Sequence, residues 1–432
     1  SPADLVVSGE TLFFAIRTPV AGRELWKSDG SLAGTELVRD VGIYPRGDAH
    51  PRRFTQVGQY IYFIADSLEG GVELWRSDGT PLGATRVADL RPGEEGSDPF
   101  WLTEYNGELV FGADDGTTGL EPWRTDGTEV GTVQIKDINP LGSSLYHEYI
   151  YSYVVKWERS VGPYKEFQGQ LFFAADDGVH GFELWKTDGT ENGTVLFKDI
   201  DTSLEYSNSF PGAVYAGDIG FVESNDTLFF FAQDETSRQE LWKTDGTEEG
   251  TTIVKDIVPD NGFSHTGQLT DVDGTLFFVI NDGIHGNELW KSDGTEAGTV
   301  LVKDINPGEG SSEPYRLTAM NDTLFFFADD GEGSPGLWKS DGTEAGTVFL
   351  KDIAPYRSNY DNGQRMAVSD GTLFFAGDNE LNGKELWKSD GTVAGTVLVA
   401  DIFPDDVSSY PREITPIDGG VAFTVEADGA EG

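Results

Sequence analysis

The chain alternates short apolar runs with turn-forming residues. Runs of four to six aromatic and β-branched residues are separated by Asn-Asp, Asp-Gly and Gly-Thr steps along the 432 residues. Aromatic and β-branched residues favour strands, whereas Gly, Asn and Asp favour the turns between strands. No stretch keeps a helical period over two turns, so the sequence predicts an all-β protein with almost no helix.

A tryptophan recurs eight times with a period near 48 residues, usually within Glu-Leu-Trp. An Asp-Gly pair begins three residues after every such Trp, and a second Asp follows fourteen residues after it. We expect this Trp to be a buried wedge between neighbouring sheets, because large aromatic side chains are mostly used in cores. The eight structural tryptophans are Trp26, Trp75, Trp123, Trp185, Trp242, Trp290, Trp338 and Trp387.

Each repeat predicts four short antiparallel strands. In the best-formed repeat they lie around Leu317 and over Leu324–Ala328, Leu337–Ser340 and Thr347–Ile353. A single four-stranded sheet cannot bury both of its faces, so the repeats must stack, and their period is typical of propeller blades. The sequence therefore predicts an eight-bladed β-propeller over residues 1–410. A surplus strand pair, Ile414–Val425, lies within residues 411–432 and predicts a partial ninth repeat, either a truncated repeat or a hairpin that closes the ring or docks on another copy.

The repeated segment Glu-Leu-Trp-Lys-Ser-Asp-Gly-Thr-Glu-Ala-Gly-Thr resembles the ELWxxDGT-repeat proteins of bacterial surface and secreted proteomes. Its Ser-Asp-Gly-Thr turn is also similar to the Asp-box hairpin of sialidase-type propellers. The resemblance covers nearly the whole chain, and Leu120-Glu-Pro-Trp123 and Gly336-Leu-Trp338 each depart from it by one residue. It implies an extracellular or cell-surface repeat module.

Charge and cysteine content exclude several classes of function. The 75 acidic and 30 basic residues give a net charge of −45, which opposes binding to nucleic acid or to anionic lipid. Cysteine is absent, so no disulfide, thiolate metal site or thiol nucleophile can form. No apolar stretch approaches the roughly 20 residues of a membrane-spanning helix. We therefore expect a protein or glycan partner, with no nucleic acid and no membrane span.

Paired acidic residues recur in the loop between the second and third strands. Carboxylate pairs with neighbouring carbonyl groups suit Ca²⁺, which takes six to eight oxygen ligands. Solvated Asp-Gly turns on an acid-rich surface, such as one adapted to salt, would give the same pattern. The predicted calcium ligands are Asp114, Asp115, Asp176, Asp177, Asp282, Asp329 and Asp330.

An aromatic insertion at about residues 141–162 follows the third repeat. Aromatic planes with a few polar tips are what a sugar or peptide site needs, and lengthened loops often carry function. The same residues could form a hairpin that packs its own aromatic side chains. The predicted ligand-binding residues are Tyr146, His147, Tyr149, Tyr151, Tyr153, Trp157 and Arg159, together with Trp101. We expect a partner on the face formed by the loops that follow the second and fourth strands.

No catalytic motif stands out, and no catalytic residue is predicted. The sequence favours a non-catalytic extracellular module for adhesion or surface assembly, which could include copies of the chain itself. A lectin-like glycan binder that uses the insertion is one alternative. A polysaccharide hydrolase or lyase is the other, because two carboxylates could meet as an acid and a base.

Overall fold

The computed structural model describes most of the chain. No helix occurs in the described residues, and so none there could span a bilayer. The chain divides into two compact units, of which the first holds Ser1–Tyr149, Pro163–Gly181 and Trp185–Leu196 and the second holds Ile150–Gly162, Phe182–Leu184 and Phe197–Gly432. The described residues are 3–19, 21–41, 48–67, 70–145, 160–161, 164–202, 209, 211, 213–214, 220–236, 239–258, 267–333, 335–355, 366–379, 381–404 and 407–426.

Antiparallel sheets account for all the regular structure that is described. There are seven four-stranded sheets, one five-stranded sheet and two strand pairs in this part of the chain. The prediction of an all-β fold built from four-stranded antiparallel sheets is confirmed. In the seventh repeat the strands lie at Tyr315–Met320, Thr323–Ala328, Gly336–Ser340 and Val348–Lys351, close to the ranges expected from the sequence.

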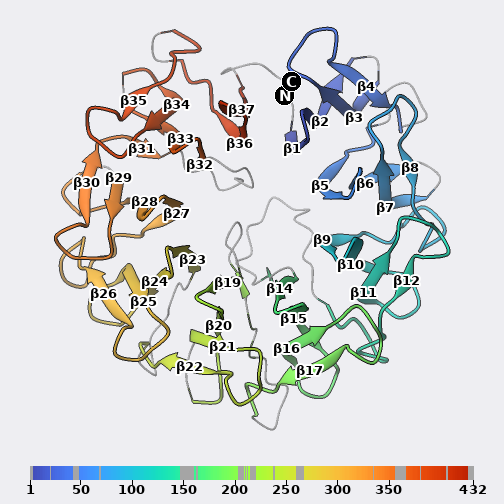
Figure 1. Ribbon diagram of the computed structural model, residues 1–432, viewed down its shortest axis with the longest axis horizontal. Coiled ribbons are helices and arrows are strands. Elements are labelled where there is room, and N and C mark those ends of the chain that lie inside the picture. Colours follow the sequence, from blue (N-terminus) through green and yellow to red (C-terminus); the bar gives the residue numbers. More distant parts are fainter. Residues whose placement is uncertain are drawn as a thin grey trace. The chain divides into compact units, whose positions relative to one another are not determined.

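The first unit begins with three complete sheets, and Figure 1 labels their strands. The first sheet has β1 (Ala3–Ser8), β2 (Thr11–Thr18), β3 (Gly22–Ser28) and β4 (Glu36–Arg39). The second has β5 (Arg52–Val57), β6 (Tyr60–Ser67), β7 (Gly71–Ser77) and β8 (Thr85–Arg86). The third has β9 (Phe100–Tyr105), β10 (Glu108–Asp114), β11 (Leu120–Thr125) and β12 (Val133–Gln134). The fourth has β14 (Lys165–Phe167), β15 (Gln170–Asp176), β16 (Phe182–Thr187) and β17 (Val195–Lys198), of which β16 and β17 carry residues of both units.

The second unit holds the remaining sheets. The fifth has β19 (Phe221–Ser224), β20 (Thr227–Ala232), β21 (Glu240–Thr244) and β22 (Thr252–Lys255), and the sixth has β23 (Gly267–Val272), β24 (Thr275–Asn281), β25 (Asn287–Ser292) and β26 (Val300–Lys303). The seventh has β27 to β30, at the four ranges given above. The eighth has β31 (Ala354–Pro355), β32 (Met366–Ser369), β33 (Thr372–Asp378), β34 (Lys384–Ser389) and β35 (Val397–Leu398). The two strand pairs are β13 (Ser160–Val161) with β18 (Ala213–Val214), and β36 (Arg412–Ile417) with β37 (Gly420–Thr424).

The Asp-Gly-Thr segment makes the turn between the third and fourth strands. In the sixth sheet the Asp293 carboxylate accepts hydrogen bonds from the backbone N–H and the hydroxyl of Thr295, at 2.9 and 2.7 Å. Gly294 has φ +85°, a left-handed conformation that residues with a Cβ rarely adopt. The repeated segment is therefore a local turn signal, and it recurs as Asp-Gly-Thr in seven repeats and as Asp29-Gly30-Ser31 in the first.

Consecutive sheets within each unit share a hydrophobic core. Trp290 of β25 is 7% exposed and packs with Phe231 and Leu241 of the fifth sheet. The Lys255 ammonium group of the fifth sheet lies 5.9 Å from the Trp290 ring centroid and donates a hydrogen bond to the carbonyl of Thr299. Seven of the eight repeated tryptophans are buried, whereas Trp26 of the first sheet is half-buried. In both units, consecutive sheets are thus held together mainly by packing around the repeated Trp.

Candidate functional site

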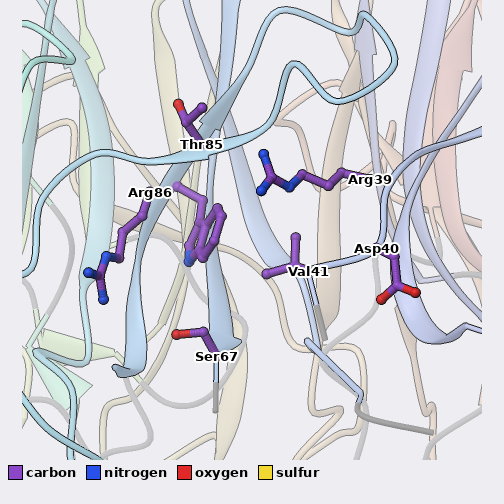
Figure 2. Close-up of a pocket in the computed structure, with 7 residues that line it drawn as sticks. Arg39, Asp40, Val41, Ser67, Thr85 and Arg86 are labelled. Atoms are coloured by element: carbon purple, nitrogen blue, oxygen red, sulfur yellow. The ribbon is translucent and has the colours of Figure 1, made fainter. Parts of the chain in front are cut away.

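A cavity of about 320 Å³ lies between the first and second sheets, within the first unit. Figure 2 shows the side chains of Arg39 and Arg86 on opposite sides of this pocket. Arg39 ends β4, and Arg86 ends β8. The residues that line the pocket, which we call the Trp75 pocket, are Arg39, Asp40, Val41, Ser67, Trp75, Thr85 and Arg86.

The pocket arises because Arg86 replaces an apolar residue of the repeat. Arg86 pairs with Trp75 across β7 and β8. In the seventh sheet the residue that pairs with Trp338 is Phe349. The two rings pack edge to face, with 5.5 Å between their centroids. Six of the eight repeats have Leu, Ile or Phe there. A charged guanidinium group does not cover the indole ring as an apolar side chain does, so space remains beside Trp75.

Arg39 likewise replaces the lysine that most repeats place over the next Trp. Lys303 and Lys351 donate hydrogen bonds to the carbonyls of Thr347 and Thr396, at 2.9 and 2.6 Å. Arg39 Nη1 makes the corresponding bond to the carbonyl of Ala84 at 2.5 Å. Because the guanidinium group has five N–H donors, most of them stay available after this bond.

The pocket brings two arginine side chains together in a strongly acidic protein, beside the exposed carboxylate of Asp40. Arg86 Nη2 lies 2.9 Å from Oδ2 of Asp89, whereas Arg39 forms no ion pair with any carboxylate in the described part of the chain. The Trp75 side chain is 8% exposed, and its Nε1 has no acceptor among the described residues. The pocket therefore offers guanidinium donors to an anion or to another acceptor, beside the face of a buried indole.

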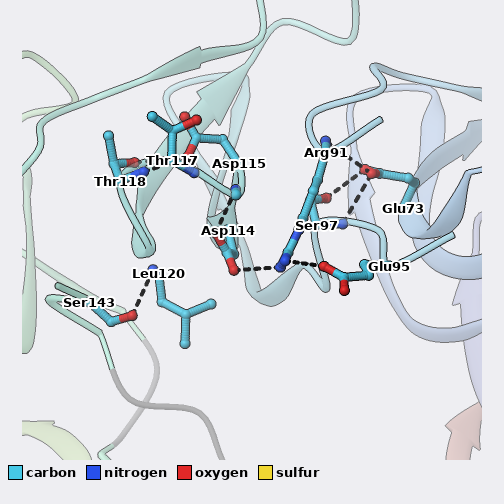
Figure 3. A network of polar contacts seen from close by, with 11 residues as sticks. Glu73, Arg91, Glu95, Ser97, Asp114, Asp115, Thr117, Thr118, Leu120 and Ser143 are labelled. Atoms are coloured by element: carbon cyan, nitrogen blue, oxygen red, sulfur yellow. Dashed lines mark hydrogen bonds and ion pairs between the residues drawn. The ribbon is translucent and has the colours of Figure 1, made fainter. Parts of the chain in front are cut away.

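A second polar feature repeats through both units, namely a buried Glu two residues before the Trp in seven of the eight repeats. Figure 3 shows Glu73 bonded to the segment that follows β8. Its Oε1 accepts the backbone N–H groups of Ser97 and Arg91, at 3.0 and 3.4 Å, and its Oε2 accepts the Ser97 hydroxyl at 2.5 Å. The same carboxylate–hydroxyl bond joins Glu121 to Ser144, Glu183 to Ser209, Glu288 to Ser312 and Glu385 to Ser409.

Burial raises the pKa of these glutamates because it disfavours the charged form. The pKa of Glu73, Glu121 and Glu288 rises to about 7, and that of Glu183 and Glu240 rises to about 8. Hydrogen bonds from the Ser residues and backbone amides oppose the rise. Sequence reasoning missed these residues, although Glu stands at this position in seven of eight repeats.

The predicted calcium ligands serve mainly as turn acceptors. The Asp177 carboxylate accepts the backbone N–H groups of Val179 and His180, and its Oδ2 lies 2.8 Å from His180 Nδ1. Asp282 binds His285 in the same way at 2.7 Å. The backbone N–H groups of Gly178, Thr117, Gly331 and Glu332 donate to Asp176, Asp115, Asp329 and Asp330, respectively.

Asp114 accepts a hydrogen bond within its own turn and also pairs with the guanidinium group of Arg91. Its Oδ1 accepts the N–H of Gly116, and its Oδ2 lies 2.7 Å from Arg91 Nη1 (Figure 3). Over the residues that the structure describes, no group of three or more His, Asp or Glu side chains is placed to hold a metal. Calcium binding stays a prediction, which the melting temperature in chelator and in millimolar Ca²⁺ at matched ionic strength would test.

Most of the predicted ligand-binding residues lie outside the described residues. These are Tyr146, His147, Tyr149, Tyr151, Tyr153, Trp157 and Arg159. Trp101 is described and half-buried, with φ +53° at an irregular point of β9. Its ring packs edge-on against Phe100 and Tyr164, at 4.9 and 5.9 Å between centroids. The expected partner face and the extracellular location stay predictions.

No protein-family model and no curated protein matches the sequence. The backbone is similar to that of the computationally designed protein Ika8, with 14% identity over 88% of this chain and 93% of that chain and a TM-score of 0.44. It is also similar to a puromycin-hydrolysing peptidase from Mycobacterium tuberculosis, with 11% identity over 88% of this chain and 58% of that chain and a TM-score of 0.39. For a solved prolyl endopeptidase the identity is 12%, over 89% of this chain and 55% of that chain, with a TM-score of 0.44. The chain thus spans little more than half the length of these enzymes.

The comparisons correct the function expected from the sequence. We predicted a non-catalytic module for adhesion or surface assembly, and that prediction is wrong, because the natural neighbours named above are hydrolytic enzymes. The likeness, at TM-scores of 0.39 and 0.44, is one of backbone alone and transfers no activity. The glycan-binding and polysaccharide-cleaving alternatives belonged to the same prediction and are not carried further.

Proposed function

We propose that the eight sheets are the blades of a β-propeller that binds a small organic carboxylate in the Trp75 pocket. The sheet order and the shared cores of consecutive sheets support the propeller. The observation that carries the ligand proposal is the pair of guanidinium groups, Arg39 and Arg86, that flank a buried indole.

Charge favours an anion at this place. The chain carries a net charge of −45, yet two guanidinium groups and one carboxylate, that of the exposed Asp40, line this cavity, and only Arg86 is paired with a carboxylate in the described residues. A bound carboxylate would accept charge-assisted hydrogen bonds from the guanidinium groups, each worth about 1.5–3 kcal/mol. Those bonds would also neutralise Arg39.

The size and walls of the pocket favour a ligand with a ring. A volume of about 320 Å³ lies at the small end of ligand pockets. Trp75 and Val41 supply apolar contacts, while Ser67 and Thr85 supply hydroxyl groups. A compact ring that carries one carboxylate matches this combination.

Isothermal titration calorimetry of the full chain with benzoate and with benzyl alcohol tests the proposal. We expect benzoate to bind at least about tenfold more tightly, because only the carboxylate pairs with the guanidinium groups. Arg86→Leu restores the usual apolar residue and should abolish binding without unfolding the sheet. Arg39→Lys restores the usual lysine and should weaken binding to a smaller extent.

Arg124→Leu is the matched control, because this Arg pairs with Glu108 in the third sheet, outside the pocket. It should leave binding unchanged. Equal affinity for benzoate and benzyl alcohol, or unchanged affinity in Arg86→Leu, would show that the pocket is not a carboxylate site.

A further inference from the structure

The Trp75 pocket holds a carboxylate as well as its two guanidinium groups. Asp40 lines the pocket and is exposed, and no hydrogen bond or ion pair joins its carboxylate to another residue in the described part of the chain. Figure 2 shows Asp40 and Arg86 on opposite sides of Val41. Groups of opposite charge therefore line different parts of one cavity.

Asp40 lacks the cationic partner that its counterpart in the second sheet has. Asp89 holds the same position in the second repeat, where its Oδ2 lies 2.9 Å from Arg86 Nη2. Arg86 pairs across its sheet with the repeated Trp, and in the first sheet Leu37 holds that place. Because Leu37 carries no charge, the first repeat offers Asp40 no equivalent of the Arg86 guanidinium group.

The location of Asp40 in the pocket distinguishes it from similar residues. Three other repeats also have an exposed Asp at this position, with no hydrogen bond or ion pair to a described residue, namely Asp137, Asp256 and Asp352. Asp40 is the member of this group that lines the Trp75 pocket. The other three therefore serve as matched controls for the loss of one carboxylate.

The charges at the pocket are balanced. The guanidinium groups of Arg39 and Arg86 are matched by the carboxylates of Asp40 and of Asp89, the partner of Arg86. A bound monoanion would leave one net negative charge here, in a protein whose net charge is −45. A ligand with one carboxylate and one ammonium group would keep the balance and would avoid the long-range repulsion between the protein and an anion.

We propose that the ligand of the Trp75 pocket is a zwitterion, a ring compound that carries an ammonium group as well as the carboxylate. This inference rests on the proposed carboxylate site. The ligand carboxylate is held by Arg39 and Arg86, and the ammonium group pairs with Asp40. The ring lies between the two charges, against Val41 and Trp75. Ring carboxylates with an amino substituent are the expected ligand class.

Isothermal titration calorimetry of the full chain with two matched ligands tests the proposal. Para-aminomethylbenzoate and para-hydroxymethylbenzoate have nearly the same size and shape, but only the first carries an ammonium group at neutral pH. We expect the amino compound to bind about three- to fivefold more tightly, which is toward the upper end of what one exposed ion pair contributes.

Two variants assign this preference to Asp40. Asp40→Asn keeps the shape of the side chain and removes its charge, so the affinity ratio of the two ligands should fall at least about twofold. The same variant should bind benzoate about twofold more tightly, because a repelling charge is removed. Asp352→Asn changes the net charge equally at the same repeat position outside the pocket, and it should leave both quantities unchanged.

The outcomes separate this inference from the carboxylate site on which it rests. Binding of benzoate together with equal affinity for the two matched ligands would overturn the zwitterion and leave the carboxylate site standing. An affinity ratio that Asp40→Asn and Asp352→Asn lower equally would do the same, because the field of the whole chain would then be its cause. An absence of binding by benzoate and by both matched ligands would overturn the two proposals together.

Discussion

The Glu73 carboxylate and the Ser97 hydroxyl form a hydrogen bond of 2.5 Å, and both side chains are fully buried. The two residues lie 24 positions apart, so the bond ties the segment after β8 to the third strand of the second sheet. Four other repeats make the same bond. In these five repeats the Glu two residues before the Trp therefore anchors the connection to the next repeat.

Removing the hydroxyl should destabilise the protein. Ser97→Ala leaves Oε2 of Glu73 buried without its hydrogen bond, which costs about 1–3 kcal/mol. We expect the free energy of unfolding in urea to fall by that amount. Ser143→Ala, which removes a hydroxyl bonded to the Leu120 N–H near the surface, is the control and should cost less. Equal losses of unfolding free energy in the two variants would mean that the buried Glu73–Ser97 bond stabilises the fold no more than a surface bond does.

In the first repeat the reverse substitution, from Ala to Ser, can be made. Ala49 is fully buried and its N–H donates to the Arg23 carbonyl, so it stands where other repeats have the bonded Ser. Ala49→Ser should give Glu24 a hydroxyl partner and stabilise the fold by about 1 kcal/mol. A lower melting temperature for Ala49→Ser would show that this repeat has no room for the pair.

The buried glutamates predict a loss of stability at alkaline pH. Their pKa is about 7 to 8 in the folded protein, against an ordinary value of 4.5. Between these values the folded state holds more protons than the unfolded state, so the free energy of unfolding falls as pH rises. We expect it to be highest near pH 5 and to decrease through pH 9.

Glu73→Gln isolates one contribution to this slope. Gln does not titrate, so the variant should lose less stability between pH 5 and pH 9 than the unaltered chain, by about 1–3 kcal/mol. Parallel pH profiles for the two proteins would contradict the assignment.

At acid pH, stability depends on the turn Asp residues. Hydrogen bonds from Thr lower the pKa of residues such as Asp293 and Asp341, so the stability that their ionised carboxylates contribute is lost as pH falls below about 4.

Replacing a repeated Trp by Ala should lower the free energy of unfolding more where that Trp is more deeply buried. Trp290→Ala removes a ring that is 7% exposed and covered by Lys255, and it should cost about 3–5 kcal/mol. Trp26 is half-buried, so Trp26→Ala should cost clearly less in the same denaturation experiment. A larger loss at Trp26 would argue against Trp burial as the source of sheet-to-sheet stability.

The sheets were predictable because their signals are local and repeated. Apolar runs separated by Asp-Gly and Asn-Asp place strands such as β28 and turns such as that at Gly294 without knowledge of distant contacts. The surplus hairpin was recognisable for the same reason. The buried Glu–Ser bonds were not, because they join residues 23 to 26 positions apart, and a Glu within a strand reads as a solvent-facing residue.

The Trp75 pocket was missed because it results from departures from the repeat. Sequence reasoning gave weight to what recurs, such as the Asp pairs, and to the aromatic insertion. Arg39 and Arg86 carry a signal only when the repeats are aligned, since each replaces the residue type that most other repeats have at its position. Their meeting across two sheets depends on packing between repeats.

The most direct test of the ligand proposal is the indole N–H spectrum of the ¹⁵N-labelled chain during titration with benzoate. The Trp75 resonance, assigned by its loss in Trp75→Phe, should shift saturably while the other indole resonances stay in place, and benzyl alcohol should not reproduce the shift. A Trp75 resonance that does not move, or equal movement of all indole resonances, would contradict a carboxylate site between Arg39 and Arg86.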